Sequence, residues 1–353
     1  MLKYLRLFLL PFNVDYALVV YIRNKCYDLR IFTSTEFDLP IICVGNLAVG
    51  GSGKTPTTEY LVALLGDYKI AILSRGYGRK TRGYILADNK ATAVTIGDEP
   101  MQYFQKFKHV TIAVCEDRVY GVEKLKDTHD VILLDDAYQH RRLKAGFNIL
   151  LFEFAKLQGF QCLLPAGNLR EPFYATNRAQ SILVTKSPAI IADESSVAIA
   201  NKLSLQTHQI LAFSTISYGK LTSLYNGTEI ENDQTLAVFL LTGIANPIPL
   251  KEYLKHEGFD VTSFEYPDHH RFTTSDIKQL VQAFDVHPSQ RKIIITTEKD
   301  GQRLLDNNLK DLLLNLPVYY LPIKIELNAE DKNKFDQKIL AYVSCTKRID
   351  KIH

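Results

Sequence analysis

The chain has 353 residues, of which 46% are hydrophobic and 23% charged, and it carries a formal net charge of +3. This length suffices for two domains with buried cores, and the composition is that of a globular protein. The small net charge and the lack of an arginine-rich stripe argue against nucleic acid as a partner. Five scattered cysteines without metal-ligand spacing favour a reducing, cytoplasmic setting.

The first thirty residues form an apolar and aromatic segment that charges interrupt. Pro11 and Asp15 break every stretch that would otherwise be long enough to span a bilayer. No small-residue cleavage site follows, which argues against a signal peptide. Two interpretations remain: an amphipathic helix packed on the protein, or an interfacial anchor whose cations, among them Lys3, Arg6 and Arg23, meet anionic lipid.

A glycine-rich loop follows the first apolar strand candidate and precedes a helix candidate, which is the context of a nucleotide phosphate loop. The predicted phosphate-binding residues are Gly50, Gly51, Ser52, Gly53, Lys54 and Thr55. In such loops backbone N–H groups and a lysine bind phosphates, and a Thr hydroxyl ligates Mg²⁺. Ala48 occupies the position where the usual spacing has a glycine, five residues before Gly53.

From residue 40 onwards, strand candidates alternate with helix candidates, which predicts parallel strands joined by crossovers. The first series of expected strands comprises residues 41–44, 69–73, 110–114, 131–134, 148–152 and 181–184. The second series comprises residues 236–241, 261–264, 292–296 and 318–321. We therefore expect an α/β protein with a membrane-interfacial segment at 1–30, a P-loop core domain with a mostly parallel sheet at 31–215, and a smaller α/β domain at 216–353.

Polar residues after the expected strands are the candidates for a site, because ligands bind beyond the carboxyl ends of parallel strands. Asp135 and Asp136 end the apolar run 131–134, where a P-loop enzyme holds Mg²⁺. Gln139 and His140 follow closely enough to join the same site.

A second group of candidates is suited to accepting a proton. Asp98 follows Gly97 at the start of an expected helix, where it serves either as a helix-terminal acid or as a carboxylate that accepts a proton from an attacking hydroxyl. His269 and His270 lie in the second expected domain. If the domains close over a cleft, one of these histidines would meet Asp98 as base and orienter.

Two loops carry residues suited to an anionic, sugar-bearing substrate. Arg75 and Tyr77 follow the second strand candidate, and Asn168, Arg170 and Glu171 share a turn-rich loop. Arginine offers a planar fork for phosphate, and a glutamate near a metal can add a ligand.

Taken together, these motifs resemble the tetraacyldisaccharide 4'-kinase family, whose members phosphorylate a lipid A precursor. The resemblance runs from about Met1 to Leu305 and accounts for Ala48, because the family's loop has the double-glycine form. Ala137 departs from the glycine usual in the family's aspartate motif. The motifs that carry the resemblance to this family are Gly45-Asn46, 50–56, 74–78, 97–100, Asp117-Arg118, 135–140, 165–172, 267–270 and 297–300.

The resemblance implies a role for each candidate. Residues 50–54 would hold the phosphates of ATP, and Asp98 with His269 would activate the 4'-hydroxyl. The implied Mg²⁺ ligands are Thr55, Asp135, Asp136 and Glu171. The implied substrate contacts are Arg75, Tyr77, Gln139, His140, Asn168 and Arg170. The motifs leave open which aspartate ligates the metal and which of the two adjacent histidines, at 269 and 270, partners Asp98.

The implied reaction is ATP-dependent phosphorylation of a tetraacyldisaccharide 1-phosphate to give lipid IVA, at the cytoplasmic face of a bacterial inner membrane. A lipid acceptor favours the anchor interpretation of residues 1–30, and no protein partner is implied. Two alternatives stay open: a P-loop switch protein and a soluble small-molecule kinase. A GTP-dependent switch protein would need an Asn-Lys-x-Asp motif that binds the guanine base after a strand. Residues 333–336 match these letters but lie in an expected helix, which argues against the switch protein.

Overall fold

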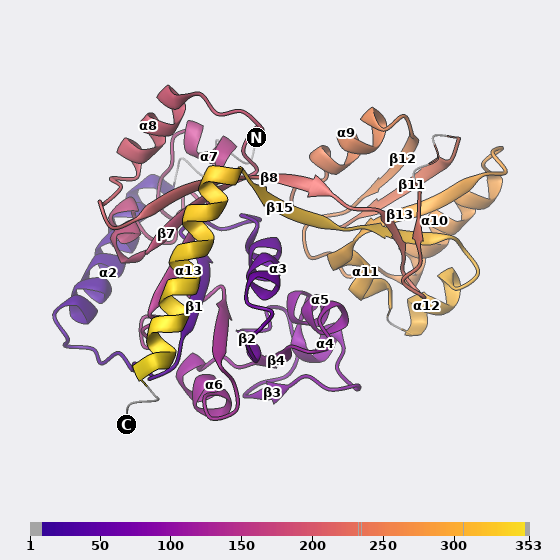
Figure 1. The fold of residues 1–353 in the computed structure, drawn as a ribbon. Helices are drawn as coiled ribbons and strands as arrows, with labels where there is room; N and C mark the ends of the chain where they lie inside the picture. Colours follow the sequence, from indigo (N-terminus) through magenta and orange to yellow (C-terminus); the bar gives the residue numbers. More distant parts are fainter. Residues whose placement is uncertain (1–8, 232, 234, 306, 350–353) are drawn as a thin grey trace.

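The computed structural model describes residues 9–231, 233, 235–305 and 307–349, which form two β-sheets with helices on their faces (Figure 1). The first sheet has nine strands in the order β15-β8-β7-β6-β1-β5-β2-β4-β3, and the second has six in the order β10-β9-β14-β13-β11-β12. No helix within the described ranges is long and apolar enough to span a bilayer.

The nine-stranded sheet is parallel from β8 to β4, as the alternating sequence pattern predicts, with antiparallel strands at its edges. Its strands are β1 (Ile41–Asn46), β2 (Ile70–Ser74), β3 (Ile85–Leu86), β4 (Thr111–Val114), β5 (Val131–Asp135), β6 (Phe147–Glu153), β7 (Ser181–Thr185), β8 (Ile210–Tyr218) and β15 (Ile323–Leu327). The run 41–44 is apolar throughout because both faces of the sheet are covered: Ile41 and Cys43 pack in one core, Ile42 and Val44 in the other.

Helices cover both faces of this sheet. They are α3 (Lys54–Leu64), α5 (Asp98–Lys106) and α13 (Ala329–Ile349) on one face, and α6 (Arg118–Leu125), α7 (Phe154–Gln158) and α8 (Asp193–Lys202) on the other. Two short helices, α4 (Ala93–Ile96) and the 3-10 helix η2 (Phe173–Arg178), lie in the connections. The carboxyl ends of β1, β5 and β2 therefore meet at one edge, next to the first turns of α3 and α5.

The second sheet repeats this layered plan on a smaller scale. Its strands are β9 (Leu221–Ser223), β10 (Glu229–Ile230), β11 (Ala237–Thr242), β12 (Asp260–Glu265), β13 (Lys292–Thr297) and β14 (Val318–Leu321). Its helices are α9 (Ile248–His256) on one face, and α10 (Thr274–Val286), α11 (Glu298–Leu304) and α12 (Asn307–Leu313) on the other. The short strands β9 and β10 are not among the strands expected from the sequence.

The chain returns to the first sheet at its C-terminal end. β15 pairs antiparallel with β8, from Ile323 opposite Tyr218 to Leu327 opposite Ser214. α13 then packs against this sheet (Figure 1), and its residues Phe335, Ile339 and Val343 are fully buried in the same core as β1. We expected residues 216–353 to form the second domain; instead, β15 and α13 pack with the first, because their apolar residues complete its sheet and cover one of its faces.

The N-terminal segment contains the helix α2 (Leu10–Asp28), and residues 1–8, with Lys3 and Arg6, lie outside the described residues. The expected amphipathic pattern is not confirmed. Only Val20 and Asn24 of α2 are buried. The exposed apolar and aromatic residues of the helix are Leu10, Phe12, Val14, Leu18, Val19, Tyr21 and Ile22.

Candidate active site

The phosphate loop connects β1 to α3 at the edge where the carboxyl ends of the parallel strands meet. Gly50 has φ 103° and Gly53 has φ 83°, a left-handed conformation in which glycine carries no steric cost. Ala48 lies before this turn and pairs antiparallel with Leu169 of the loop that precedes η2. A glycine is therefore not needed at residue 48, because that residue belongs to a short bridge rather than to the phosphate-binding turn.

Asp135 and Asp136 lie beside this loop at the end of β5. Asp135 is 1% exposed, and its Oδ1 has no hydrogen-bond partner within the described part of the chain. Burial and the charges of Glu99 and Asp136 raise the pKa of Asp135 to about 7. A carboxylate that is crowded by other carboxylates and has an open oxygen is suited to a cation.

Asp136 faces two cationic side chains. Its Oδ1 lies 3.7 Å from Nζ of Lys54 and 3.2 Å from a guanidinium nitrogen of Arg170. Asp136 itself has φ 49°, which is uncommon for an L residue other than Asn, Asp or His. The structure thus brings together the expected phosphate-binding lysine, one expected metal ligand and one expected substrate residue.

Asp98 begins α5 and reaches across to the second sheet's domain. Its Oδ2 accepts hydrogen bonds from Nε and Nη2 of Arg303 at 3.0 and 2.6 Å, and Nδ1 of His269 lies 3.5 Å away. Burial alone would raise the pKa of Asp98, but hydrogen bonds from His269 and Arg303 lower it to about 2. Asp98 is therefore a carboxylate at neutral pH, positioned against one imidazole.

His269, rather than His270, is the histidine beside Asp98. Its Nε2 lies 3.3 Å from Nζ of Lys299, and its ring centroid lies 5.2 Å from that of Tyr77. His270 instead contacts Asp276 through Nε2 at 2.9 Å, within the N-terminal capping box of α10. The geometry therefore separates a histidine at the domain interface from one that stabilises a helix terminus.

The two groups of residues are connected through Glu99. Its charge contributes to the raised pKa of Asp135, and its Oε1 accepts a hydrogen bond from Lys299 at 3.2 Å. Lys299 also contacts His269. Contacts through Lys299 thus join Glu99 to His269, while the charge of Glu99 acts on Asp135 at the end of β5.

The loop that carries Asn168 and Arg170 is held against the start of the phosphate loop. Val49 N donates to Asn168 O at 2.8 Å, and Arg170 N donates to Leu47 O at 2.6 Å. The buried Glu171, expected among the metal ligands, is instead paired with Arg178 and lies 3.7 Å from Arg23.

Gln139 and His140 lie next to this loop system. Gln139 Nε2 donates to the carbonyl of Asn46 at 2.8 Å, which ties the aspartate loop to the end of β1. Burial and the charge of Arg118 lower the pKa of His140 to about 4, so its ring is neutral at pH 7. Its buried Nε2 has no hydrogen-bond partner among the described residues and is available to a ligand. Arg75 and Tyr77 are both exposed after β2.

Sequence reasoning gave no role to Arg303, Lys299 or Glu99, although all three contact the Asp98–His269 pair or its neighbours. Lys299 lies directly after β13, in the turn that opens α11. Charged residues after a strand were the signal that identified Asp135, and the same rule applied to the second sheet would have found Lys299. Arg303 lies one helical turn further along and gave no such signal.

Comparisons with known proteins agree with these motifs. The family model described as tetraacyldisaccharide-1-P 4'-kinase matches residues 5–344. The chain belongs to the tetraacyldisaccharide 4'-kinase family. It is 42% identical over 351 residues to the tetraacyldisaccharide 4'-kinase of Bacteroides thetaiotaomicron, covering 95% of this chain and 92% of the relative. It is 44% identical over 348 residues to that of Flavobacterium johnsoniae, covering 96% and 97%.

A solved structure of the family is also similar. LpxK from Aquifex aeolicus, crystallised in complex with ATP, matches with a TM-score of 0.75 and 30% identity, covering 96% of this chain and 99% of that one. The resemblance and the expected α/β P-loop kinase fold are thereby confirmed. Asn333 to Asp336, which imitate a base-reading motif, lie within α13, where Phe335 is buried and Asp336 accepts a hydrogen bond from Tyr60.

Proposed function

We propose that this protein transfers the terminal phosphate of ATP to the 4'-hydroxyl of a tetraacyldisaccharide 1-phosphate. Family membership supports the reaction, and one observation in the structure carries the proposal. The Asp98–His269 pair is formed between the two domains and contacts Lys299, which binds Glu99, and the charge of Glu99 acts on Asp135 beside the phosphate loop. A base for the acceptor hydroxyl and a site for the donor phosphates therefore share one edge of the sheet.

The residues at this edge fit Mg²⁺ bound together with ATP. No group of three His, Cys, Asp or Glu residues in the described ranges is arranged to hold a metal alone. Mg²⁺ in kinases is bound through one or two carboxylates together with substrate phosphates, so a complete protein cage is not required. Asp135, with its open buried oxygen, and Asp136 and Thr55 would hold the ion, which neutralises charge on the phosphates when bound. Glu171, whose Oε1 also has no hydrogen-bond partner among the described residues, would join these ligands only by giving up its ion pairs with Arg178 and Arg23.

The chain's own residues then supply positioning and proton transfer. Lys54 directs its ammonium to the phosphate side of the loop, where it contacts Asp136. Asp98 is ionised at neutral pH, so it can accept a proton from the 4'-hydroxyl or hold His269 in the orientation that does so. Arg303 keeps Asp98 ionised and in place from the other domain. Positioning by domain closure and removal of one proton are the main requirements of phosphoryl transfer.

The acceptor would bind on the side of the sheet edge formed by the two substrate loops. Arg75, Tyr77 and Asn168 are exposed there, and Arg170 and His140 are partly buried. We assign the arginines to the sugar headgroup and its 1-phosphate, because guanidinium groups bind phosphate in a planar, bidentate geometry.

We propose that α2 lies on the membrane surface. Three of its polar side chains contact the protein: Asn13 donates to Leu163 O at 3.0 Å, Tyr16 donates to Arg170 O at 3.0 Å, and Arg23 donates to Gln139 O. Its apolar side chains remain exposed, with Phe12 at 58% and Val14 at 70%. An exposed apolar surface of this kind favours insertion among lipid headgroups. The cytoplasmic face of the inner membrane follows as the location, since ATP is available there.

The proposed reaction is tested by incubating the protein with labelled ATP, Mg²⁺ and tetraacyldisaccharide 1-phosphate in mixed micelles. A bisphosphorylated lipid is the expected product, and its absence with an intact, ATP-binding protein would refute the proposed acceptor. A water-soluble disaccharide that lacks acyl chains serves as the comparison. Faster transfer to that compound would favour a soluble small-molecule kinase.

A further inference from the structure

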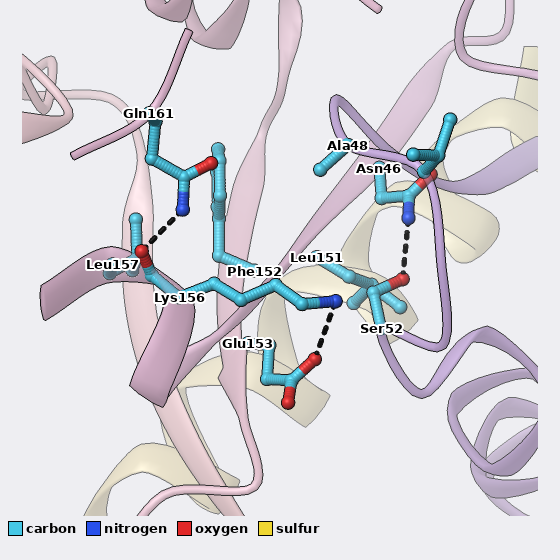
Figure 2. Close-up of a pocket in the computed structure, with 10 residues that line it drawn as sticks. Asn46, Ala48, Ser52, Leu151, Phe152, Glu153, Lys156, Leu157 and Gln161 are labelled. Atoms are coloured by element: carbon cyan, nitrogen blue, oxygen red, sulfur yellow. Dashed lines mark hydrogen bonds and ion pairs between the residues drawn. The ribbon is translucent and has the colours of Figure 1, made fainter. Parts of the chain in front are cut away.

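Two lysines and a glutamate flank the phosphate loop on the side of β6 and β7. Nζ of Lys156 lies 2.8 Å from Oε2 of Glu153, and Nζ of Lys186 lies 3.5 Å from the same oxygen. Figure 2 shows Lys156 reaching from α7 towards Glu153, and Asn46 hydrogen-bonded to Ser52; all four residues line a small pocket beside the loop. These cations are not among the residues that the phosphate-loop motif identifies.

Each carbonyl of the glycine-rich turn accepts a hydrogen bond. Gly50 O accepts from Ser52 N at 2.9 Å, and Gly53 O accepts from Thr57 N at 3.1 Å. Ser52 O accepts from Oγ1 of Thr185 at 2.9 Å, and Gly51 O accepts from Nζ of Lys186 at 2.7 Å. Lys186 is the charged donor among these four.

The direction of these carbonyls decides where the loop can bind an anion. In a planar trans peptide the C=O and the following N–H point in opposite directions. Holding the carbonyl of Ser52 towards β7 therefore turns the N–H of Gly53 the other way, towards the space above α3. Lys186 fixes the preceding peptide, whose N–H, that of Ser52, donates to Gly50 O and so closes the turn that precedes Gly53. A phosphate loop depends on such ordered N–H groups, and flexible glycines cannot order them without outside contacts.

Lys186 is itself held in an uncommon backbone conformation. It has φ 53°, a left-handed value that residues other than Gly, Asn and Asp seldom adopt. Such a conformation persists where the surrounding structure fixes it, and it is most frequent at functional sites. Here it directs the side chain from the end of β7 back over the loop, where the ammonium meets Gly51 O.

We propose that Lys186, supported by Thr185 and Glu153, is a positioning residue that orders the phosphate loop for the triphosphate of ATP. It acts through the backbone of Gly51 and Ser52 and does not touch the acceptor. The proposal rests on the proposed function only in naming ATP as the phosphate donor.

The direct test is Lys186→Ala, with ATP affinity measured by calorimetry without lipid. Loss of a hydrogen bond to a charged group should weaken ATP binding about tenfold. The KM for ATP should rise in parallel while the KM for the lipid is unchanged, and Lys186→Arg should recover part of the loss. Lys202→Ala is the matched control, because Lys202 also donates to backbone carbonyls, those of Leu157 and Gly159, but not to the phosphate loop.

A second variant keeps the test decisive if Lys186→Ala folds poorly. Lys186→Asn suits the left-handed backbone but is too short to reach Gly51 O, so its melting temperature should match that of the wild type while its ATP affinity falls. Thr185→Val should weaken ATP binding in the same direction by a smaller factor.

Wild-type ATP affinity in a folded Lys186→Asn protein would overturn the proposal. An equal rise in the KM of ATP and lipid would overturn it as well. Because ATP binding is measured without lipid, failure to phosphorylate the proposed acceptor would leave this result unaffected, and the two failures are distinguishable.

Discussion

Replacing Asp98 with asparagine removes the carboxylate charge at the domain interface and nearly preserves the side chain's shape. In the wild type this carboxylate accepts two hydrogen bonds from Arg303 and lies beside His269. All of these partners come from the other domain, so the substitution tests catalysis and domain contact together.

The free energy that this carboxylate contributes to the contact between the domains follows from its lowered pKa. Hydrogen bonds and charge lower the pKa of Asp98 from 3.8 to about 2. At 1.36 kcal/mol per pKa unit, this difference of nearly two units corresponds to about 2 kcal/mol in favour of the charged form. The contribution is fully present above the ordinary pKa of aspartate and is lost as the pH falls towards 2. At pH 7 we expect Asp98→Asn to weaken the contact between domains by about that amount.

The kinetic effect should be larger than the structural one. A positioned base contributes about a hundredfold or more, so kcat should fall by at least that factor while the KM for ATP changes little. Steady-state kinetics with varied ATP measure kcat and the KM for ATP. Amide hydrogen exchange across α11 measures how far the contact between the domains is weakened. A near-normal kcat, or a defect confined to the KM for ATP, would refute the assignment of Asp98 to proton transfer.

Three further substitutions test the interface and the residues next to it. His269→Asn should lower kcat strongly. His270→Asn should mainly lower the melting temperature, because it loses the contact with Asp276 in the capping box of α10. The reverse pattern in matched assays would exclude His269 as the partner of Asp98. Lys106→Met leaves the carboxylates of Glu59 and Glu298, 8% and 9% exposed, without their shared ammonium, and should cost about 3–5 kcal/mol in urea denaturation. Burial and the charge of Glu298 raise the pKa of Glu59 to about 7, so this loss should grow as the pH rises from 6 to 8; a pH-independent loss would contradict it.

Much of the fold could be predicted because its determinants are local. The apolar runs at 41–44 and 131–134 identify buried parallel strands, and the observed β1 and β5 extend them by only one or two residues. The glycines and the lysine of the phosphate loop are equally local. The apolar and polar residues of β15 alternate, which is the pattern of a half-buried strand, but nothing in residues 323–327 indicates that their partner is β8, more than a hundred residues away.

The candidate site was predictable where a residue directly follows a strand, as Asp135 does. The choice between His269 and His270 was not, because adjacent residues in a loop differ only in which way the chain turns them. Arg303 lies 205 residues from the aspartate that it binds, and no local pattern connects them. Contacts between domains depend on how the domains dock, and local sequence patterns do not reveal that docking.

The return of the chain through β15 makes the second domain an insertion within the first. The two ends of this insertion are adjacent, since Gly219 N donates to Pro322 O at 2.8 Å. The domain is therefore attached by a two-stranded ribbon, β8 with β15, rather than by a single flexible linker. Two hydrogen-bonded strands resist independent twisting, so the ribbon limits the directions in which His269 can move away from Asp98 and guides it back to the same place.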